Sequence, residues 1–445
     1  MKLIKDSYWI KSGIYSLLQN FFSLLFGFGG FYLLVRLLDK SHMGSYTLFV
    51  TVTSILEVAR VGFIKYGFIK FRAEVDEAEH GKLFTAAFFL NVVFAALISI
   101  GMLLLGKWLS VVWKSHELQN MFYLYAITSI VLVPFFQFEY LQHALLDFKR
   151  VFLAYFIRSG VLFFAILFSY LGFYPLDIFR LVLFNLLGAF VASLFSFIIT
   201  NKPLGFSSSV DWVWIKKLVQ FGKFVVGTNL GSMLYSAVDQ FMLGSLLSTA
   251  SVAVYNVGGR ITNLVNLPSV SLSAIVFPHS AKLIKSEGKD AVRDLYEQSV
   301  GAILCIALPA VVFTLIFPHW IIAVIAPDYS DTVPILQVTI FMSLFLPFAY
   351  QFGVTLDSMG YPHRNFYVTA SFFIINLILN YFWISNFGVM GAAYGTLSTT
   401  IIGFVVMQII LYKMIGVNVL KVFKNTIHFY GRLFYTAHEF VFKKR

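Results

Sequence analysis

Twelve apolar stretches, most of them 20 or more residues long, follow one another through the 445 residues of this chain. The hydrocarbon core of a bilayer is about 30 Å thick, so one helical crossing needs roughly 20 apolar residues. These stretches are apolar all round, whereas a surface helix of a soluble domain keeps one polar face. The sequence therefore predicts an all-α polytopic membrane protein with about twelve transmembrane helices.

The composition supports this class and excludes others. Hydrophobic residues make up 59% of the chain and charged residues 12%, against about 25% charged in an ordinary globular domain. The sequence contains no Gly-rich phosphate loop, nucleophile elbow, paired-carboxylate site or His/Cys metal cluster. We therefore expect neither an enzyme nor a cofactor or metal. The predicted spans lie at residues 14–38, 44–68, 83–105, 119–141, 151–173, 178–200, 220–245, 252–277, 298–325, 333–355, 365–386 and 389–412.

The net charge of +12 is unevenly distributed along the chain. Most Lys and Arg residues lie in the two termini and in the even-numbered links, for example Lys70, Arg72, Lys149 and Arg150. Lys and Arg accumulate in cytoplasmic loops, so both termini are predicted to be cytoplasmic. The basic excess is then a topology signal with attraction to anionic lipid, and nucleic acid is not an expected partner. No small-residue cleavage site follows the basic start, so a removed signal peptide is not expected.

An internal repeat predicts the domain organisation. Residues 37–46 (LLDKSHMGSY) align without gaps on residues 246–255 (LLSTASVAVY), and the same offset pairs Asn20 with Asn229 and Ser23 with Ser232. We expect two homologous six-helix lobes, residues 1–205 and 206–413, around a central cavity, as in alternating-access transporters. The basic and aromatic tail, residues 414–445, is too broken to span and is expected along the cytoplasmic interface.

Polar stripes on two spans are the first candidate site. Asn256, Arg260 and Asn263 recur at i, i+4 and i+7, which places them on one helical face. A second stripe consists of Asn229, Ser232, Ser236 and Asp239. Polar side chains inside a membrane face a water-filled cavity or a partner, so the stripes either bind a polar cargo or hydrogen bond between helices.

Further ionisable residues lie within the first lobe. Glu57 and Arg60 are three residues apart on one span, so they either neutralise each other or face the cavity. Arg158 either lines the cavity or extends to the cytoplasmic headgroups. Arg36, near the outer end of the first span, has the same two options at the outer surface.

Several motifs resemble one transporter family. They are residues 34–38 (LVRLL), 43–46 (MGSY), 236–240 (SAVDQ), 254–257 (VYNV) with Arg260 and Pro278, and 388–393 (GVMGAA). In this order they resemble bacterial oligosaccharide flippases, the polysaccharide transporter branch of the multidrug/oligosaccharidyl-lipid/polysaccharide exporter superfamily. The second span departs from the pattern, because residues 57–62 (EVARVG) carry a base as well as an acid before the glycine.

The resemblance implies a fold, a cargo and roles. Such proteins move undecaprenyl-pyrophosphate-linked sugar repeat units to the outer leaflet of the bacterial inner membrane, for O-antigen, capsule or other surface polysaccharide. Lipid-linked oligosaccharide and polysaccharide polymerase or assembly proteins are then the expected partners. Arg residues suit a pyrophosphate because their donors bind it bidentately. The expected cargo contacts are Arg60, Arg158, Arg260, Asn256, Asn263 and Arg36, and the expected ion-coupling or sugar contacts are Asp239, Glu57, Asn229, Ser232 and Ser236.

Two alternatives belong to other classes. A multidrug or metabolite exporter coupled to Na⁺ or H⁺ usually handles cations, whereas the arginines within these spans outnumber the acids that we identified. A membrane glycosyltransferase or polymerase would carry a sizeable external loop, but the longest external link is only residues 106–118.

Overall fold

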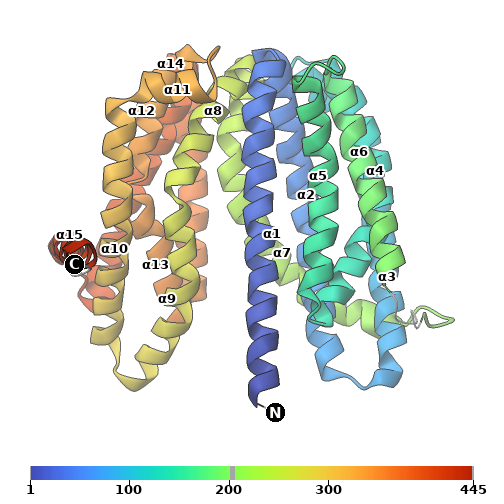
Figure 1. Ribbon diagram of the computed structural model, residues 1–445, viewed down its shortest axis with the longest axis horizontal. Coiled ribbons are helices and arrows are strands. Elements are labelled where there is room, and N and C mark those ends of the chain that lie inside the picture. The colour runs from blue at the N-terminus through green and yellow to red at the C-terminus, as the bar shows by residue number, and fades with distance from the viewer. Residues whose placement is uncertain (1, 201–205, 443–445) are drawn as a thin grey trace. The chain divides into compact units, whose positions relative to one another are not determined.

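The structure is a computed structural model that describes residues 2–200 and 206–442 (Figure 1). It does not describe the side chains of residues 2–10, 224, 228, 229, 232 and 433–442. By length and composition, ten helices of the described residues can cross a membrane. Every predicted span overlaps a helix, so the predicted all-α membrane class is confirmed.

Contacts divide the chain into two compact units: residues 1–237 with 248–253, and residues 238–247 with 254–445. The division does not test the predicted homology of lobes 1–205 and 206–413, and their central cavity also stays a prediction. The helices of unit 1 are α1 (Lys2–Leu37), α2 (Lys40–Glu74), α3 (Glu77–Val112), α4 (Glu117–Ala144), α5 (Phe148–Tyr170), α6 (Ile178–Ile199) and most of α7 (Trp212–Leu246).

Unit 2 contains the end of α7 and most of α8. Its helices are α8 (Thr249–Val265), α9 (Leu267–Ser286), α10 (Lys289–Ile316), α11 (Pro318–Ile325), the short 3-10 turn η1 (Ser330–Thr332), α12 (Val333–Met342), α13 (Leu346–Ser358), α14 (Pro362–Ile415) and α15 (Val419–Phe442).

Helix α4 lies at the centre of unit 1 and packs against α2, α3, α5 and α6. Its Phe135 and Tyr140 are fully buried, together with Phe68 of α2 and Leu218 of α7. Lipid supplies no hydrophobic force between helices, so van der Waals packing and hydrogen bonds must hold such a bundle together. Polar groups on α4 are therefore placed where several helices can satisfy them.

The core of unit 2 lies between α10, α13, α14 and α15. Tyr296 of α10, Phe352 of α13, Leu411 of α14 and Val422 of α15 are buried in one cluster. Helix α15 lies close against α10, since a Cβ on Gly301 would approach Asn425. Helix α15 is the main described part of the tail predicted at residues 414–445, and its place at the membrane interface stays a prediction.

Three spans that we predicted as continuous are each divided into two helices, which corrects the prediction in this detail. The divided spans are residues 252–277, 298–325 and 333–355. In each, a proline lies at the start of the second helix: Pro268 in α9, Pro318 in α11 and Pro347 in α13. Proline lacks an N–H and clashes with the preceding turn, so it suits the first turn of a helix and ends the one before it.

Helix α14 contains the last two predicted spans, 365–386 and 389–412, and breaks between them as expected. Gly388 has φ 60° and ψ −136° at the break. Only glycine adopts this backbone region without steric cost, so the glycine allows two helical arms to meet there.

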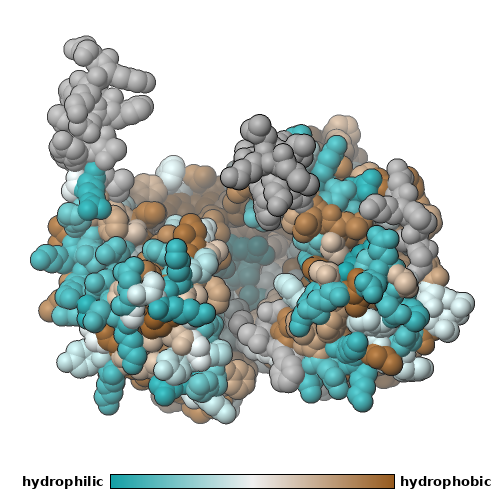
Figure 2. Space-filling model, turned by 90° about the horizontal axis from the view of Figure 1, so that it is seen from below, coloured by the Kyte–Doolittle hydropathy of each residue, from teal (hydrophilic) through white to brown (hydrophobic). Residues whose placement is uncertain are grey.

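Hydrophilic residues gather at helix ends. Figure 2 shows them (teal) on the face seen from below Figure 1. Along the middle of the helices, large apolar side chains are exposed instead, among them Leu97, Ile100, Phe190 and Ile378. This pattern is typical of helices that meet lipid at mid-height and water at their ends.

Candidate functional site

An ion pair lies inside unit 1 and joins α2 to α5. The Arg158 Nη2 atom donates to Glu57 Oε1 over 2.6 Å, and the side chains are only 18% and 22% exposed. The Tyr125 hydroxyl of α4 donates to the same carboxylate oxygen over 3.4 Å. Removing one partner of a buried pair leaves an uncompensated charge, so each partner depends on the other.

Arg60 lies one turn along α2 and is almost fully buried, at 1% exposed. Its Nε donates to Asn91 Oδ1 over 2.7 Å, its Nη1 to the Ser129 carbonyl over 3.0 Å, and its Nη2 to the Asn91 carbonyl over 3.3 Å. Asn91 is oriented in turn by Gln137, whose Oε1 accepts from Asn91 Nδ2 over 3.1 Å. Neutral acceptors from α3 and α4 therefore solvate the Arg60 charge.

This arrangement decides between two interpretations of the sequence. Glu57 pairs with Arg158 and not with Arg60, so mutual neutralisation of Glu57 and Arg60, one of the two options that their spacing left open, is wrong. The sequence places Arg60 on the same helix, but Arg158 reaches Glu57 from a neighbouring helix. Arg158 turns inward to this carboxylate and does not extend along its own helix to the headgroups.

The structure brings Arg60 and Arg158 together around one ring. Their guanidinium carbons lie 4.9 Å and 5.7 Å from the Phe136 ring centroid. Arginine stays charged in proteins, so these two cations and the single anion of Glu57 carry a net charge of one. Unit 1 thus has a positive site within its membrane region.

A second charged group of unit 1 was missed in the sequence. Glu139 on α4 accepts from Lys65 Nζ on α2 over 2.6 Å and lies 2.9 Å from His143 Nε2. The Tyr155 hydroxyl lies 3.5 Å from the same oxygen. Lys65 and Glu139 fall within the predicted spans 44–68 and 119–141, so a complete count of charged residues there finds them.

Asp239 is the buried acid of unit 2. Its Oδ2 accepts from the Tyr255 hydroxyl of α8 over 2.5 Å and from Thr396 Oγ1 of α14 over 2.8 Å. Its Oδ1 accepts from Asn380 Nδ2 over 2.7 Å. Three neutral donors hold this carboxylate, and none of them cancels its charge.

Two arms of α14 position this acid's partners. A Cβ on Gly391 would overlap the Trp383 carbonyl, so the arms after and before Gly388 touch backbone to backbone. This contact places Asn376 and Asn380 opposite the second arm, where Asn376 Nδ2 lies 3.4 Å from Thr399 Oγ1. The Oδ1 atoms of Asn376 and Asn380 are buried without a hydrogen-bond partner, which is rare for buried polar atoms.

The oxygen-rich cluster around Asp239 suits a hard cation or a proton. It combines one carboxylate with the hydroxyl oxygens of Tyr255 and Thr396, and the neighbouring Asn376 and Asn380 each carry an unpartnered amide oxygen. Hard cations prefer oxygen ligands, and transporters bind coupling ions at interrupted helices. Within the described residues, no group of three or more His, Cys, Asp or Glu side chains could hold a metal ion.

The predicted stripe on α8 forms in part. Arg260 Nε donates to Asn256 Oδ1 over 3.4 Å, as the four-residue spacing predicts, and Asn263 is exposed on the same helix. Ser236 is exposed on α7, while the side chains of Asn229 and Ser232 lie outside the described residues. Arg36 folds back on α1, donating to the Tyr32 carbonyl over 2.7 Å and lying 3.6 Å from the Tyr32 ring.

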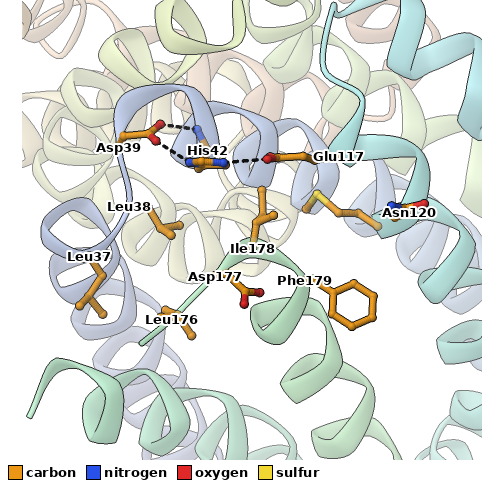
Figure 3. A pocket seen from close by; sticks show the side chains of 11 residues that line it. Leu37, Leu38, Asp39, His42, Glu117, Asn120, Leu176, Asp177, Ile178 and Phe179 are labelled. Atoms are coloured by element: carbon orange, nitrogen blue, oxygen red, sulfur yellow. Dashed lines mark hydrogen bonds and ion pairs between the residues drawn. The ribbon is translucent and has the colours of Figure 1, made fainter. Parts of the chain in front are cut away.

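A pocket of about 390 Å³ opens in unit 1 at the ends of α1, α2, α4 and α6 (Figure 3). Acidic side chains, Asn120 and His42 line one part, and leucine, isoleucine, methionine and phenylalanine side chains line the rest. The predicted topology places these helix ends on the external side. None of the predicted site residues lines this pocket.

Comparison with known proteins gives a family match and several curated relatives. Residues 33–334 match the family described as polysaccharide biosynthesis protein. A protein of Haloferax volcanii named "Probable flippase AglR" is 30% identical over 178 residues, which cover 39% of this chain and 37% of that protein. The chain thus spans well under half of the length of this relative.

Two solved structures share the fold. An inward-facing multidrug resistance MATE family transporter superposes with a TM-score of 0.74 at 17% identity, covering 88% of this chain and 95% of that one. The lipid II flippase MurJ, in an inward closed conformation, superposes with a TM-score of 0.76 at 15% identity, covering 93% and 90%. At these identities the likeness establishes a common fold and nothing about cargo.

Proposed function

The chain belongs to the polysaccharide biosynthesis protein family, and from this premise we propose that it is a lipid-linked oligosaccharide flippase working by alternating access. The relative named a probable flippase supports this function. Undecaprenyl pyrophosphate as the carrier lipid, O-antigen or capsule as the product, the bacterial inner membrane as the location and cytoplasmic termini are further parts of the proposal. Polymerase and assembly proteins are its proposed partners.

The positive site around Phe136 is the observation that carries this function. A pyrophosphate linkage is an anion, and in a medium of low dielectric it needs cations as partners. The sugar-linked headgroup crosses while the isoprenoid tail stays in lipid. A net positive cluster inside the membrane region is what such a headgroup requires and what a cationic drug would avoid.

Arg158 is the better placed of the two cations for direct contact with cargo. It is 18% exposed, and only its Nη2 donates to a described residue, so Nε and Nη1 can make a bidentate contact with a phosphate. Arg60, by contrast, already donates hydrogen bonds to Asn91 and to the Ser129 carbonyl. We propose that Arg158 binds the headgroup and that Arg60 contributes its charge at longer range. Arg260, with Asn256 and Asn263, is the proposed contact from unit 2.

Asp239 is the proposed coupling-ion site. Its neutral surroundings leave one negative charge. Its donor Asn380 carries an unpartnered amide oxygen, and so does Asn376, whose Nδ2 lies 3.5 Å from Thr396 Oγ1. A bound Na⁺ would satisfy these oxygens, whereas a proton would neutralise the carboxylate alone. A Na⁺-coupled drug exporter also needs a coupling-ion site. The site at Asp239 therefore supports ion-coupled transport but does not distinguish between a lipid-linked sugar and a drug as the cargo.

The experiment is a flip assay in proteoliposomes. A fluorescent lipid-linked oligosaccharide is placed in one leaflet, and its arrival in the other is detected by glycosidase accessibility. We expect Arg158→Gln and Arg260→Ala to abolish transport, and Arg158→Lys and Arg260→Lys to restore part of it. Arg293→Gln is the matched control, because Arg293 pairs with Asp290 and Asp294 at the exposed start of α10.

If Arg158→Gln transported the lipid-linked oligosaccharide at the wild-type rate, the proposed role of the positive site in cargo binding would be wrong. Transport of a cationic drug by the wild-type protein, with no movement of the lipid-linked sugar, would favour the exporter.

A further inference from the structure

His42 lies between two carboxylates at one end of unit 1 (Figure 3). Its Nδ1 is 2.5 Å from Asp39 Oδ2, and its Nε2 is 2.8 Å from Glu117 Oε1. Asp39 is the residue before α2, and Glu117 is the first residue of α4. One imidazole thus connects the start of α2 to the start of α4.

This geometry selects one protonation state. A neutral imidazole donates through one nitrogen and accepts through the other, and an ionised carboxylate only accepts. Both His42 nitrogens face carboxylate oxygens, so only the doubly protonated imidazolium can donate to both. Loss of a proton would turn one of these hydrogen bonds into a repulsion between two acceptors.

Asp39 is held in its ionised form by hydrogen bonds from His42. It also accepts from the backbone N–H of His42 over 2.9 Å, as the cap of α2. Partial burial raises the pKa of Asp39, but the hydrogen bonds from the His42 backbone and ring outweigh it and hold the pKa below its ordinary value. The carboxylate therefore stays ionised throughout the range in which histidine titrates.

The ends of the helices that line the pocket at His42 carry other charged residues. They are Arg36 on α1, Lys40 on α2, Lys114 and His116 before α4, and Asp177 and Arg180 at α6. Arg36 donates to Tyr32, and Asp177 pairs with Arg180 at 3.4 Å. Among the described residues, the ion pairs of Asp39 and Glu117 are with His42. The His42 side chain is 39% exposed, so water can deliver and remove its proton.

A second bond joins the same two segments without a titrating group. Ser45 Oγ on α2 lies 2.9 Å from Ser115 Oγ, two residues before Glu117. This pair therefore offers a matched control for the His42 contact.

We propose that His42 is a proton-binding site that fastens the start of α2 to the start of α4, so that acidity on this side of the membrane stiffens this end of unit 1. The predicted topology makes this the external side. None of the proposed cargo contacts lines the pocket at His42, and the proposal does not depend on the identity of the cargo.

The test is hydrogen–deuterium exchange of the full-length protein in lipid nanodiscs at about pH 6 and about pH 9, on either side of the ordinary titration of histidine. After correction for intrinsic exchange, we expect backbone amides at residues 39–46 and 113–121 to exchange about tenfold faster at the higher pH, the factor of one lost charge-assisted hydrogen bond. Peptides from α10 are the internal reference.

Four variants test whether the pH response comes from the contact between His42 and Glu117 or from other groups nearby. His42→Gln and Glu117→Gln should each remove the pH response, while Ser45→Ala should loosen the segment equally at both pH values and keep the response. His116→Gln should behave as wild type. Glu117→Gln retains the histidine, so it also tests the proposal if His42→Gln does not fold.

A pH response that survives in His42→Gln or in Glu117→Gln would overturn the proposal. So would its loss in His116→Gln, which would assign the response to the neighbouring histidine.

Discussion

Replacing Asn91 with leucine tests whether Arg60 is held as the structure shows. Asn91→Leu keeps a similar volume but removes the Oδ1 that accepts from Arg60 Nε at 2.7 Å. Both residues are buried, at 0% and 1% exposed, so water cannot replace the lost acceptor. The variant also leaves Gln137 Oε1 without its donor.

The magnitude follows from these contacts. A hydrogen bond to a charged group contributes about 1.5–3 kcal/mol, and an orphaned buried acceptor costs about 1 kcal/mol more. The carbonyls of Ser129 and Asn91 still accept from Arg60, so the charge is not fully uncompensated. We expect the free energy of unfolding to fall by about 3 kcal/mol, measured by reversible SDS titration in mixed micelles.

The double variant Arg60→Met/Asn91→Leu separates packing from function. It removes donor and acceptor together, and apolar replacement of buried polar partners is often neutral. Most of the lost stability should return, with a coupling energy of about 2 kcal/mol in the double-mutant cycle. Flip activity of this variant then reports whether the Arg60 charge matters for cargo.

One result would refute the reasoning. Neutral hydrogen bonds between membrane helices average only about 0.6 kcal/mol. A loss no larger than this in Asn91→Leu would show that Asn91 does not compensate a buried charge.

Three further predictions concern both units. Asp239→Asn should remove the Na⁺ or pH dependence of transport in vesicles, and it should abolish ion-induced stabilisation, which reaches about 2.7 kcal/mol at 100 times the dissociation constant; retained dependence would exclude Asp239 as the coupling site. Lys65→Met should lower the free energy of unfolding by about 3 kcal/mol because the buried Glu139 loses its lysine partner and keeps only its contacts with His143 and Tyr155, and Lys65→Met/Glu139→Leu should recover most of it in the same titration. Gly391→Val should prevent the two arms of α14 from packing, because its Cβ would overlap the Trp383 carbonyl; monodisperse protein of wild-type stability would argue against that contact.

Membrane class, approximate spans and the break at Gly388 were predictable because they depend on local composition and backbone preference. Apolar length reports bilayer thickness, and a glycine between two apolar runs marks a position where a helix can stop. The divisions after α8, α10 and α12 carried a local signal too, since a proline opens each following helix. Hydropathy alone does not locate such breaks, because the apolar run continues through them, whereas the position of the proline does.

The partners of the polar groups were much less predictable. Glu57 has Arg60 three residues away, yet it pairs with Arg158, 101 residues along the chain. Asp239 takes donors 141 and 157 residues away on α14, and a helical stripe gives no information on such distances.

By itself, the sequence determined that this protein lies in a membrane, which family it resembles and which ionisable residues are costly enough there to need partners. Tertiary structure alone decided which partner each one has, because hydrogen bonds and ion pairs act over about 3 Å while the pattern of one helix locates its residues only on that helix. Packing of α4 between its neighbours places Arg60 among acceptors and Arg158 beside Glu57. The same short range of interaction sets His42 between carboxylates from two segments, a contact that the sequence offered no means to foresee.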